Sequence, residues 1–456
     1  MQAELAIRGG TVVTPWAAFT SDVAIEGGRI AAVGDHQRGR REIDATGMLV
    51  LPGAIDAHTH MAAPVAGQRS SDDFLSGSRA AASGGVTTII DFTAGSPERS
   101  IPEAIEARER DAAPCIVDYA LHGEVVGWTP GRESEFGDAV ELGVASFKFY
   151  TTYESSGLRT PPDIMAPAFR ELAFLGAIAL VHAEDEGLLR SMAARLNEAD
   201  RGRMATLAEA RPDLAEAAAI SQVGRLARDA GCRLHIVHVS SAAGLSAVRA
   251  ARAAGGRLTA ETCPQYLLLT RDVYDLPDGH LFAVMPPLRR AEDRRTLWSG
   301  LARRDLDFVA TDHCPFTRAQ KAWRGAFDLV AYGLPGVETL LPLLFSEGVA
   351  KGRLALPDVV RLLAEGPART YGLYPAKGSL EVGADADVVL FDPAAAWTIR
   401  ASDLHMETDF SPYEGFGVTG RVVRTLSRGE EIFRDGEIVA SAGRGHRVHT
   451  KPLEVL

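Results

Sequence analysis

The sequence predicts an α/β fold, a (β/α)8 TIM-like barrel with a small β-sandwich domain formed by both chain termini. Strand-like and helix-like segments alternate through the middle of the chain, which is typical of parallel strands joined by helices. Several of these strands are nearly continuous apolar runs, as expected where helices cover both faces of a sheet. We expect residues 53–373 to form the barrel, and residues 1–52 and 374–456 the small domain.

Eight candidate strands follow one another in the central region, the number that closes a (β/α)8 barrel. They are residues 48–57, 86–92, 115–123, 144–150, 177–183, 233–240, 257–263 and 307–313. Ser100 and Glu103 have the spacing of a capping box at the start of the helix after the second strand. A doubly wound open sheet is the alternative, but the sequence has no G-x-G-x-x-G turn after the first strand.

Both ends of the chain have the alternating apolar and polar residues of short antiparallel strands. Paired glycines interrupt this pattern between Leu5 and Val33. Near the other end, residues 385–393, 421–429 and 430–439 are also expected to be strands, the last with an Asp435-Gly436 turn. Together these segments predict one small β domain.

Composition and charge narrow the range of partners. The 456 residues carry a formal charge of −12, and no cluster of Lys and Arg stands out that would bind nucleic acid or an anionic membrane. No apolar run reaches the ~18 residues of a membrane helix. Four scattered cysteines without CxxC spacing predict neither a disulfide framework nor a thiolate zinc site. We expect a cytoplasmic protein that acts on a small molecule.

Six side chains suited to a metal centre lie near the carboxyl ends of predicted strands. They are His58, His60, Lys148, His182, His238 and Asp312. In a barrel these strand ends meet at one mouth, where the fold builds its active sites. Two histidines two residues apart point to the same side of a strand and can bind one ion. Imidazole and carboxylate ligands favour Zn, with Mn or Co as alternatives.

Each of these residues also has a simpler interpretation as an ordinary polar residue of the core or of a loop. Lys148 is harder to explain in this way, because an unpaired ammonium inside an apolar strand is costly to desolvate. The coincidence of six such residues at strand ends favours the metal site. His235 is predicted to point away from it, as a structural residue, and His122 has no partner with ligand spacing.

The segments that carry these residues resemble the cyclic amidohydrolases, and within them the dihydropyrimidinase and hydantoinase group. The resemblance covers nearly the whole chain, and the order and spacing of its motifs are highly specific. The motifs are "GAIDAHTHM", "SFKFYTTY", "VHAED", "IVHVSS", "ETCPQYLLLT", "PPLR", "ATDHCPF", "LPGVETLLPLLFSEGV" and "KGSLEVGADADVVLFDP".

The resemblance implies two divalent metal ions in each chain. Lys148 would react with carbon dioxide, and its carbamate would bridge the ions. His58, His60 and Asp312 would hold one ion, and His182 and His238 the other. The ions would activate a shared water and polarise a ring carbonyl.

The resemblance also assigns two catalytic residues and the substrate contacts. Asp312 would take a proton from the attacking hydroxide and pass it to the leaving ring nitrogen. Tyr153 would hydrogen-bond to the developing oxyanion. The substrate would contact Tyr153, Met285, Tyr332 and Gly333. Met285 and Tyr332 stand where the group often has Ser and Asn, so a less usual lactam or imide remains an alternative substrate.

The predicted reaction is hydrolysis of the cyclic amide bond of dihydropyrimidines or 5-substituted hydantoins, giving N-carbamoyl amino acids. Ala62 stands where dihydroorotases typically carry Arg, which disfavours an acidic substrate. The segment 61–73 is expected to overhang the mouth and leave room for a substituent at ring carbon five. Alternatives are an allantoinase-like enzyme or other cyclic amide or imide hydrolase, a deaminase with one metal ion, and a non-catalytic scaffold protein of the same group.

The resemblance also implies a homotetramer, with a dimer as the alternative. The small domain and the C-terminal arm would join the subunits, and residues 445–456 are expected to reach a neighbour.

Overall fold

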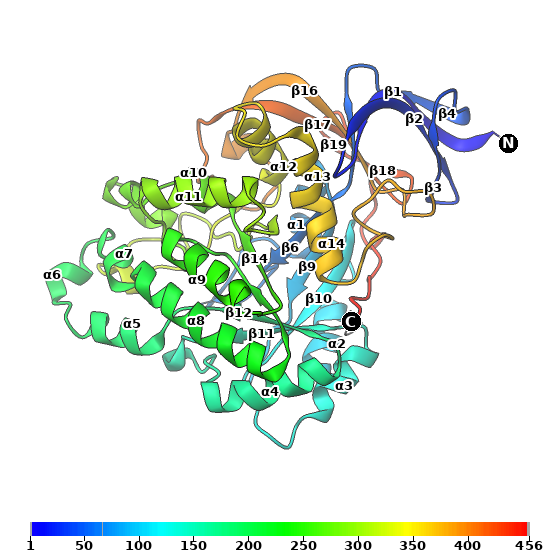
Figure 1. Cartoon of the computed structure of the whole chain (residues 1–456). Helices are drawn as coiled ribbons and strands as arrows, with labels where there is room; N and C mark the ends of the chain where they lie inside the picture. Colours follow the sequence, from blue (N-terminus) through cyan, green and yellow to red (C-terminus); the bar gives the residue numbers. More distant parts are fainter. Residues whose placement is uncertain (1, 66, 454–456) are drawn as a thin grey trace.

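Eight parallel strands form the centre of the molecule. The computed structural model describes residues 2–65 and 67–453. The strands of this sheet lie side by side in the order in which they follow along the chain, with the order β15-β14-β13-β12-β11-β10-β9-β6. An isolated parallel bridge between Thr59 and His313 joins its two ends. The predicted barrel is confirmed, and Figure 1 shows its helices packed around the strands.

The barrel strands are short and are separated by helices of unequal length. The strands are β6 (Ala54–Thr59), β9 (Val86–Phe92), β10 (Asp118–Glu124), β11 (Ser146–Tyr150), β12 (Ile178–His182), β13 (Arg233–Ile236), β14 (Leu258–Thr262) and β15 (Phe308–Val309). The helices are α1 (Phe74–Ser83), α2 (Ile101–Asp111), α3 (Ser134–Glu141), α4 (Pro162–Phe174), α5 (Glu186–Ala193), α6 (Glu198–Arg201), α7 (Thr206–Ala210), α8 (Asp213–Ala230), α9 (Ala242–Ala253), α10 (Pro264–Leu268), α11 (Ala291–Ala302), α12 (Leu340–Leu344), α13 (Leu356–Val360) and α14 (Gly366–Thr370). The capping box of Ser100 and Glu103 is present at α2.

The barrel core explains why these strands are apolar on both sides. One cluster of buried side chains lies among the strands themselves and includes Ile55, Ile90, Leu180 and Phe308. A larger cluster, which includes Phe147, lies between the strands and the helices. A strand between two apolar layers has no solvent-facing side, so its sequence shows no alternation.

The predicted strand 48–57 is in fact two strands of different sheets. Leu49–Pro52 is β5 of the small domain, and β6 of the barrel begins at Ala54. Gly53 lies between them, where an added Cβ would come within 2.0 Å of the Thr87 Oγ1 atom. The Thr87 side chain therefore occupies the space that a side chain at position 53 would need, and glycine fits this switch between sheets.

The small domain is a nine-stranded sheet built from both ends of the chain. Its strands are β1 (Ala3–Val13), β2 (Ala18–Glu26), β3 (Arg29–Gly34), β4 (Gly39–Asp44), β5 (Leu49–Pro52), β16 (Val388–Thr398), β17 (Gly417–Ser427), β18 (Glu430–Arg434) and β19 (Glu437–Ile438). Strand β4, which the sequence analysis did not predict, pairs with β1 in parallel. The sheet has its own hydrophobic cluster, to which Ile7, Val23 and Leu390 belong.

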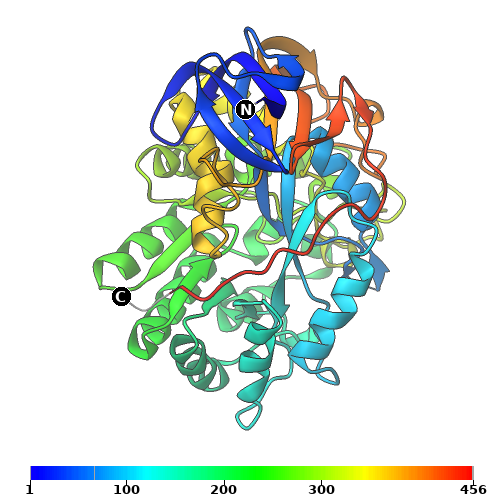
Figure 2. The same ribbon diagram turned by 90° about the vertical axis from the view of Figure 1, so that its right-hand side faces the viewer.

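The C-terminal arm packs on its own barrel over the described residues. In Figure 2 it crosses the barrel as the red segment. Backbone hydrogen bonds join it to Tyr119 through His446 and Val448, and Leu453 donates to Gly176. Residues 454–456 of the arm predicted to reach a neighbour lie outside the described residues.

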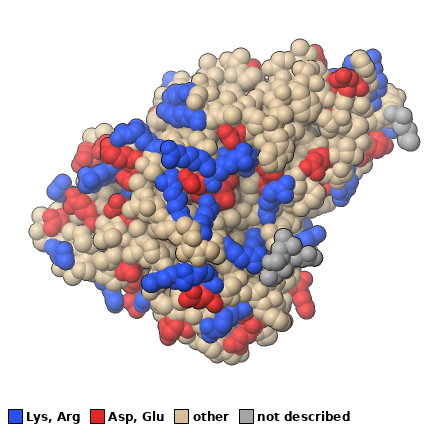
Figure 3. All heavy atoms as spheres, in the orientation of Figure 1, with Lys and Arg blue, Asp and Glu red and all other residues tan. Residues whose placement is uncertain are grey.

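Charged side chains of both signs are interspersed over the face shown in Figure 3. Among the described residues, no helix has the length and apolar character needed to cross a membrane.

Candidate metal centre and substrate cavity

A cavity of about 710 Å³ opens at the carboxyl ends of the barrel strands. All ten residues predicted as metal ligands or substrate contacts line it. They are His58, His60, Lys148, Tyr153, His182, His238, Met285, Asp312, Tyr332 and Gly333. The structure therefore brings together side chains that are up to 275 positions apart, from His58 to Gly333. This convergence follows from barrel closure, which places every strand end on one rim.

The first group in the cavity consists of His58, His60 and Asp312. The Nε2 atoms of both histidines lie 3.2 Å from the Asp312 Oδ1 atom. One potential ligand atom from each residue lies within 4.8 Å of the others. His58 Nε2 is buried and forms no hydrogen bond of good geometry with a described residue. A buried imidazole nitrogen without such a bond fits a metal ligand.

The carboxylate of Glu261 fixes the orientation of the His58 ring. The Glu261 Oε1 atom lies 2.5 Å from His58 Nδ1, so this nitrogen carries the proton and leaves the Nε2 lone pair directed at the cavity. Burial disfavours the charge of Glu261, but His58 and His235 hold its pKa at about 2. The pair has the arrangement of a carboxylate that supports a metal-binding histidine.

His182 and His238 form the second group and face each other at the ends of adjacent strands. His182 Nδ1 and His238 Nε2 are 3.0 Å apart. His182 Nε2 donates to Glu184 Oε2 at 2.8 Å, which leaves its Nδ1 atom unprotonated. Burial opposes the charge of Glu184, but the Arg211 guanidinium and His182 hold its pKa at about 2. A second histidine–carboxylate pair therefore directs a lone pair towards the same cavity.

Lys148 lies between these two groups on β11 and is only 1% exposed. Among the described residues, no carboxylate forms an ion pair with its ammonium, which lies 4.8 Å from the centre of the Phe92 ring. Burial lowers the pKa of Lys148 to about 8, although Asp312 and Glu261 oppose the shift. A lysine with a lowered pKa has a larger fraction of neutral amine, the form that reacts with carbon dioxide.

Three residues of the site have backbone conformations that non-glycine residues rarely adopt. The φ angles are 42° at His238, 54° at Asp312 and 69° at Tyr153. Such conformations persist only where surrounding contacts hold them, and they cluster at functional sites. The Tyr153 ring lies 4.9 Å from the His182 ring, and burial raises the pKa of its phenol. The phenol stays protonated at neutral pH and can donate a hydrogen bond.

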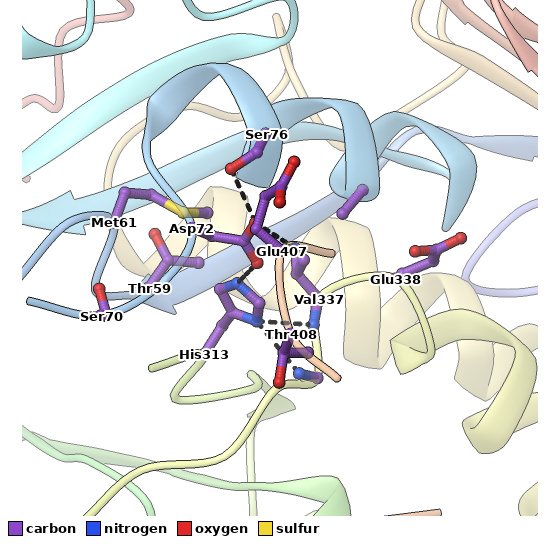
Figure 4. Close-up of polar contacts among 12 residues, drawn as sticks. Thr59, Met61, Ser70, Asp72, Ser76, His313, Val337, Glu338, Glu407 and Thr408 are labelled. Atoms are coloured by element: carbon purple, nitrogen blue, oxygen red, sulfur yellow. Dashed lines mark hydrogen bonds and ion pairs between the residues drawn. The ribbon is translucent and has the colours of Figure 1, made fainter. Parts of the chain in front are cut away.

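A buried network supports the chain behind Asp312. His313 Nε2 donates to Asp72 at 3.1 Å, and the Gly336 N–H donates to His313 Nδ1 at 3.1 Å. Asp72 also accepts a hydrogen bond from the Glu407 backbone at 2.9 Å. Figure 4 shows His313 and Asp72 at the centre of these contacts. The network ties the segment before α1, the turn after β15 and the C-terminal region together.

His122 and His235 are buried in the barrel and do not line the cavity. His122 is fully buried and bonds to Ser146 Oγ at 2.6 Å and to the Ala57 carbonyl at 3.1 Å. Burial lowers its pKa to about 3, so the ring is neutral. His235 contacts Glu261 and stacks on Phe308, away from the cavity lining.

Glu261, Glu184 and Arg211 were not among the site residues predicted from the sequence. Glu261 is a charged residue inside the apolar strand β14, the same signal that drew attention to Lys148. Glu184 lies two residues after His182, a spacing that places both side chains on one side of an extended segment. Arg211 lies in an irregular segment between α7 and α8, and no local pattern indicates its contact with Glu184.

Backbone groups are available at the predicted substrate contacts. The N–H and C=O groups of Met285 and Tyr332 form no hydrogen bond with any of the residues described. The Tyr332 hydroxyl donates to the Phe327 carbonyl at 2.8 Å, which directs the side chain along the wall. The replacement of the usual side chains at these positions therefore leaves their backbone groups free.

Comparison with known proteins decides the family. The profile of the Amidohydrolase family matches residues 49–432. The chain belongs to the amidohydrolase family. Among the curated relatives of this amidohydrolase is a D-phenylhydantoinase of Escherichia coli, 41% identical over 455 residues that cover 98% of each chain.

Solved structures of similar amidohydrolases include a dihydropyrimidinase and hydantoinases. A dihydropyrimidinase from Brevibacillus agri superposes with a TM-score of 0.96 at 36% identity and covers 99% of both chains. A D-hydantoinase from Bacillus sp. AR9 gives a TM-score of 0.95 at 36% identity, covering 99% of this chain and 100% of its own. An L-hydantoinase from Arthrobacter aurescens gives 0.89 at 29% identity, covering 98% and 100%.

Proposed function

We propose that this amidohydrolase opens the ring of 5-monosubstituted hydantoins or of dihydropyrimidines and releases N-carbamoyl amino acids. The observation that carries the proposal is the convergence of two carboxylate-supported histidine groups and a buried lysine on one cavity. The D-phenylhydantoinase and dihydropyrimidinase relatives support this class of substrate. The intact set of candidate ligands disfavours a non-catalytic scaffold.

The residues fit two divalent ions, Zn in our proposal, with Mn or Co as alternatives. His58, His60 and Asp312 would hold one ion, and His182 and His238 the other. Lys148, carboxylated by carbon dioxide, would bridge them, which accounts for the absence of an ion pair among its described neighbours. When bound, such ions supply Lewis-acid polarisation of water and of the scissile carbonyl.

The protein groups then orient the substrate and move the proton. The Asp312 carboxylate accepts the proton of the attacking water and passes it to the ring nitrogen that leaves. The Tyr153 phenol donates to the oxygen that becomes negative as the carbonyl is attacked. The free backbone N–H and C=O groups of Met285 and Tyr332 match the alternating C=O and N–H groups of a cyclic ureide, and Gly333 lines the same part of the cavity.

The cavity wall favours a substituent without charge. Ala63 and Val65, at the hairpin β7–β8 (Pro64–Val65 and Gln68–Arg69), line it together with the apolar side chains of Leu158 and Phe327. Each arginine that lines the wall forms an ion pair with a carboxylate of the protein. The pairs are Arg201–Asp328, Arg211–Glu184, Arg108–Asp91 and Arg190–Glu154. Because carboxylates of the protein already neutralise these arginines, they would not attract an acidic substituent on the substrate.

The oligomeric state and the cellular compartment of the enzyme are also part of our proposal. We place the enzyme in the cytoplasm as a homotetramer. The four free, buried cysteines fit a reducing compartment. Exposed apolar side chains such as Phe174, 84% exposed, and Trp16, 71% exposed, fit contacts between subunits. Light scattering would give four chain masses, and a single chain mass would refute the assembly.

The experiment that tests the function compares ring opening of dihydrouracil with that of 5-monosubstituted hydantoins. The protein is expressed with Zn or Mn and with bicarbonate, and its metal content is measured. We expect close to two ions per chain and a clear rate on one series, which chelation abolishes. No rate on either series, from protein that holds two ions, would refute the proposal. If the rate on substituted hydantoins is no higher than on unsubstituted hydantoin, the hypothesis that the cavity accommodates a substituent at ring carbon five is wrong.

A further inference from the structure

A second fully buried lysine lies behind the cavity wall, on the turn after β15. Lys321 has no exposed surface, and its backbone N–H closes the turn by donating to the Thr317 carbonyl at 3.0 Å. The hydrophobic portion of this side chain passes Phe316, whose ring centre lies 5.9 Å from the ammonium nitrogen. Among the described residues, no carboxylate lies within ion-pair distance of the ammonium.

The ammonium of Lys321 instead donates to three backbone carbonyls. The distances are 2.9 Å to Ala283, 2.8 Å to Ala331 and 2.8 Å to Gly333. Burial lowers the pKa of Lys321 to about 7, whereas the three oxygens favour the charged form, in which each is matched by one N–H. An arginine or an uncharged side chain would not reproduce this three-way match.

The three carbonyls belong to two separate segments of the cavity wall. Ala283 precedes Val284 and Met285, and the other two carbonyls flank Tyr332. The segments also touch directly, because the Gly333 N–H donates to the Ala283 carbonyl at 3.0 Å. Gly333 is packed so closely that an added Cβ would lie 2.3 Å from the Cys314 carbonyl oxygen. A shift of either segment would therefore change the spacing of the backbone groups that face the cavity.

We propose that Lys321 is a positioning residue that sets the distance between the Met285 and Tyr332 backbones, and so fits this edge of the cavity to a planar cyclic ureide. This inference rests on the proposed function, because it assigns the substrate to that edge. Lys321 touches neither the substrate nor the candidate metal ligands. Its effect is expected in substrate binding and not in the chemical step.

The test compares Lys321→Met and Lys321→Gln with the wild type on a 5-monosubstituted hydantoin. The Met variant loses all three donors, and the Gln variant can keep up to two. We expect KM to rise ~10-fold or more in the Met variant and by less in the Gln variant, with kcat within about threefold of the wild type. Metal content should be unchanged in both.

Arg361→Met is the matched control. Arg361 is another buried cation that donates to a backbone carbonyl, that of Leu301 at 3.0 Å; unlike Lys321 it also pairs with a carboxylate, that of Asp358, and it does not line the cavity. Its loss should lower the melting temperature and leave KM unchanged. If KM rises in the Lys321 variants but not in Arg361→Met, a general loss of stability does not explain the rise.

Three outcomes would overturn the inference while the proposed function stands. The first is an unchanged KM in folded Lys321 variants. The second is a fall in kcat and metal content without a rise in KM. The third is failure of both variants to yield soluble protein, which would mean that Lys321 is needed for folding. A wild-type protein that holds two ions and opens no ring would instead refute the proposed function, and the inference with it.

Discussion

Lys148 and Lys377 are almost equally buried, yet their surroundings give them opposite properties. Lys148 is 1% exposed and Lys377 is 2% exposed. Lys377, where the barrel meets the small domain, lies 2.5 Å from Asp118, 2.7 Å from Asp387 and 3.1 Å from Asp385. Burial opposes its charge, but these carboxylates raise its pKa above the ordinary value. Lys148 has no such partner among the described residues, and burial lowers its pKa to about 8.

The comparison shows that burial by itself does not tell a structural lysine from a reactive one. A buried ammonium surrounded by carboxylates is fixed in its charged form and joins two parts of the fold. A buried lysine that has neither a counter-charge nor the carbonyl acceptors that surround Lys321 is less stable as a cation and is available for chemistry. Four substitutions would separate the two roles.

The largest effect is expected from Lys148→Ala. In the proposed function Lys148 bridges two ions, so its removal should lower kcat/KM by more than the ~10–100-fold typical of outer metal contacts. Metal content should fall below two ions per chain, whereas the melting temperature should change little. Ring-opening assays and metal analysis of the purified variant measure both. Full activity in this variant would point to a hydrolase that uses one metal ion.

Lys377→Met should have the opposite effect. It leaves Asp118 and Asp387 buried together, with Arg428 as the remaining cation paired with Asp118. Breaking a buried pair in this way costs about 3–5 kcal/mol of unfolding free energy. Urea denaturation followed by circular dichroism would show the loss. The rate per metal-loaded chain should stay within about twofold of the wild type, and a selective loss of rate would contradict the structural role.

Glu261→Gln tests the carboxylate that orients His58. The amide keeps the shape of the side chain but weakens its bonds to His58 and His235. Metal affinity should fall by ~10–100-fold, as measured by competition with a chelator. Glu292→Gln is the control, because its side chain is 67% exposed on α11. Equal affinity in the two variants would mean that Glu261 does not support the metal centre.

The smallest effect is expected from Asp385→Asn. Asp385 is the most exposed and most distant of the three carboxylates around Lys377, at 17% exposure and 3.1 Å. A partly solvated pair of this kind contributes about 1 kcal/mol or less. The same denaturation experiment measures this difference against Lys377→Met. A loss as large as that of Lys377→Met would show that the three carboxylates act as one unit.

The sequence by itself determined the barrel and the candidate ligands. Apolar runs, helix caps and turn residues are local signals, because burial and backbone geometry act over a few neighbouring residues. They placed His58, Lys148 and Asp312 at strand ends, and the barrel rule then brought these ends together. The buried charge of Lys148 was also visible in the sequence, because it interrupts an apolar strand.

Only the tertiary structure decided which partners surround each of these groups. Glu261 reaches His58 across 203 positions, and Lys321 reaches the Ala283 carbonyl across 38. The positive φ angles of Asp312 and His238, and the switch of sheets at Gly53, are likewise features of the folded chain that no local sequence pattern predicted. Whether a buried charge is paired, and with what, depends on segments far apart in the chain, and no local pattern in the sequence encodes that pairing.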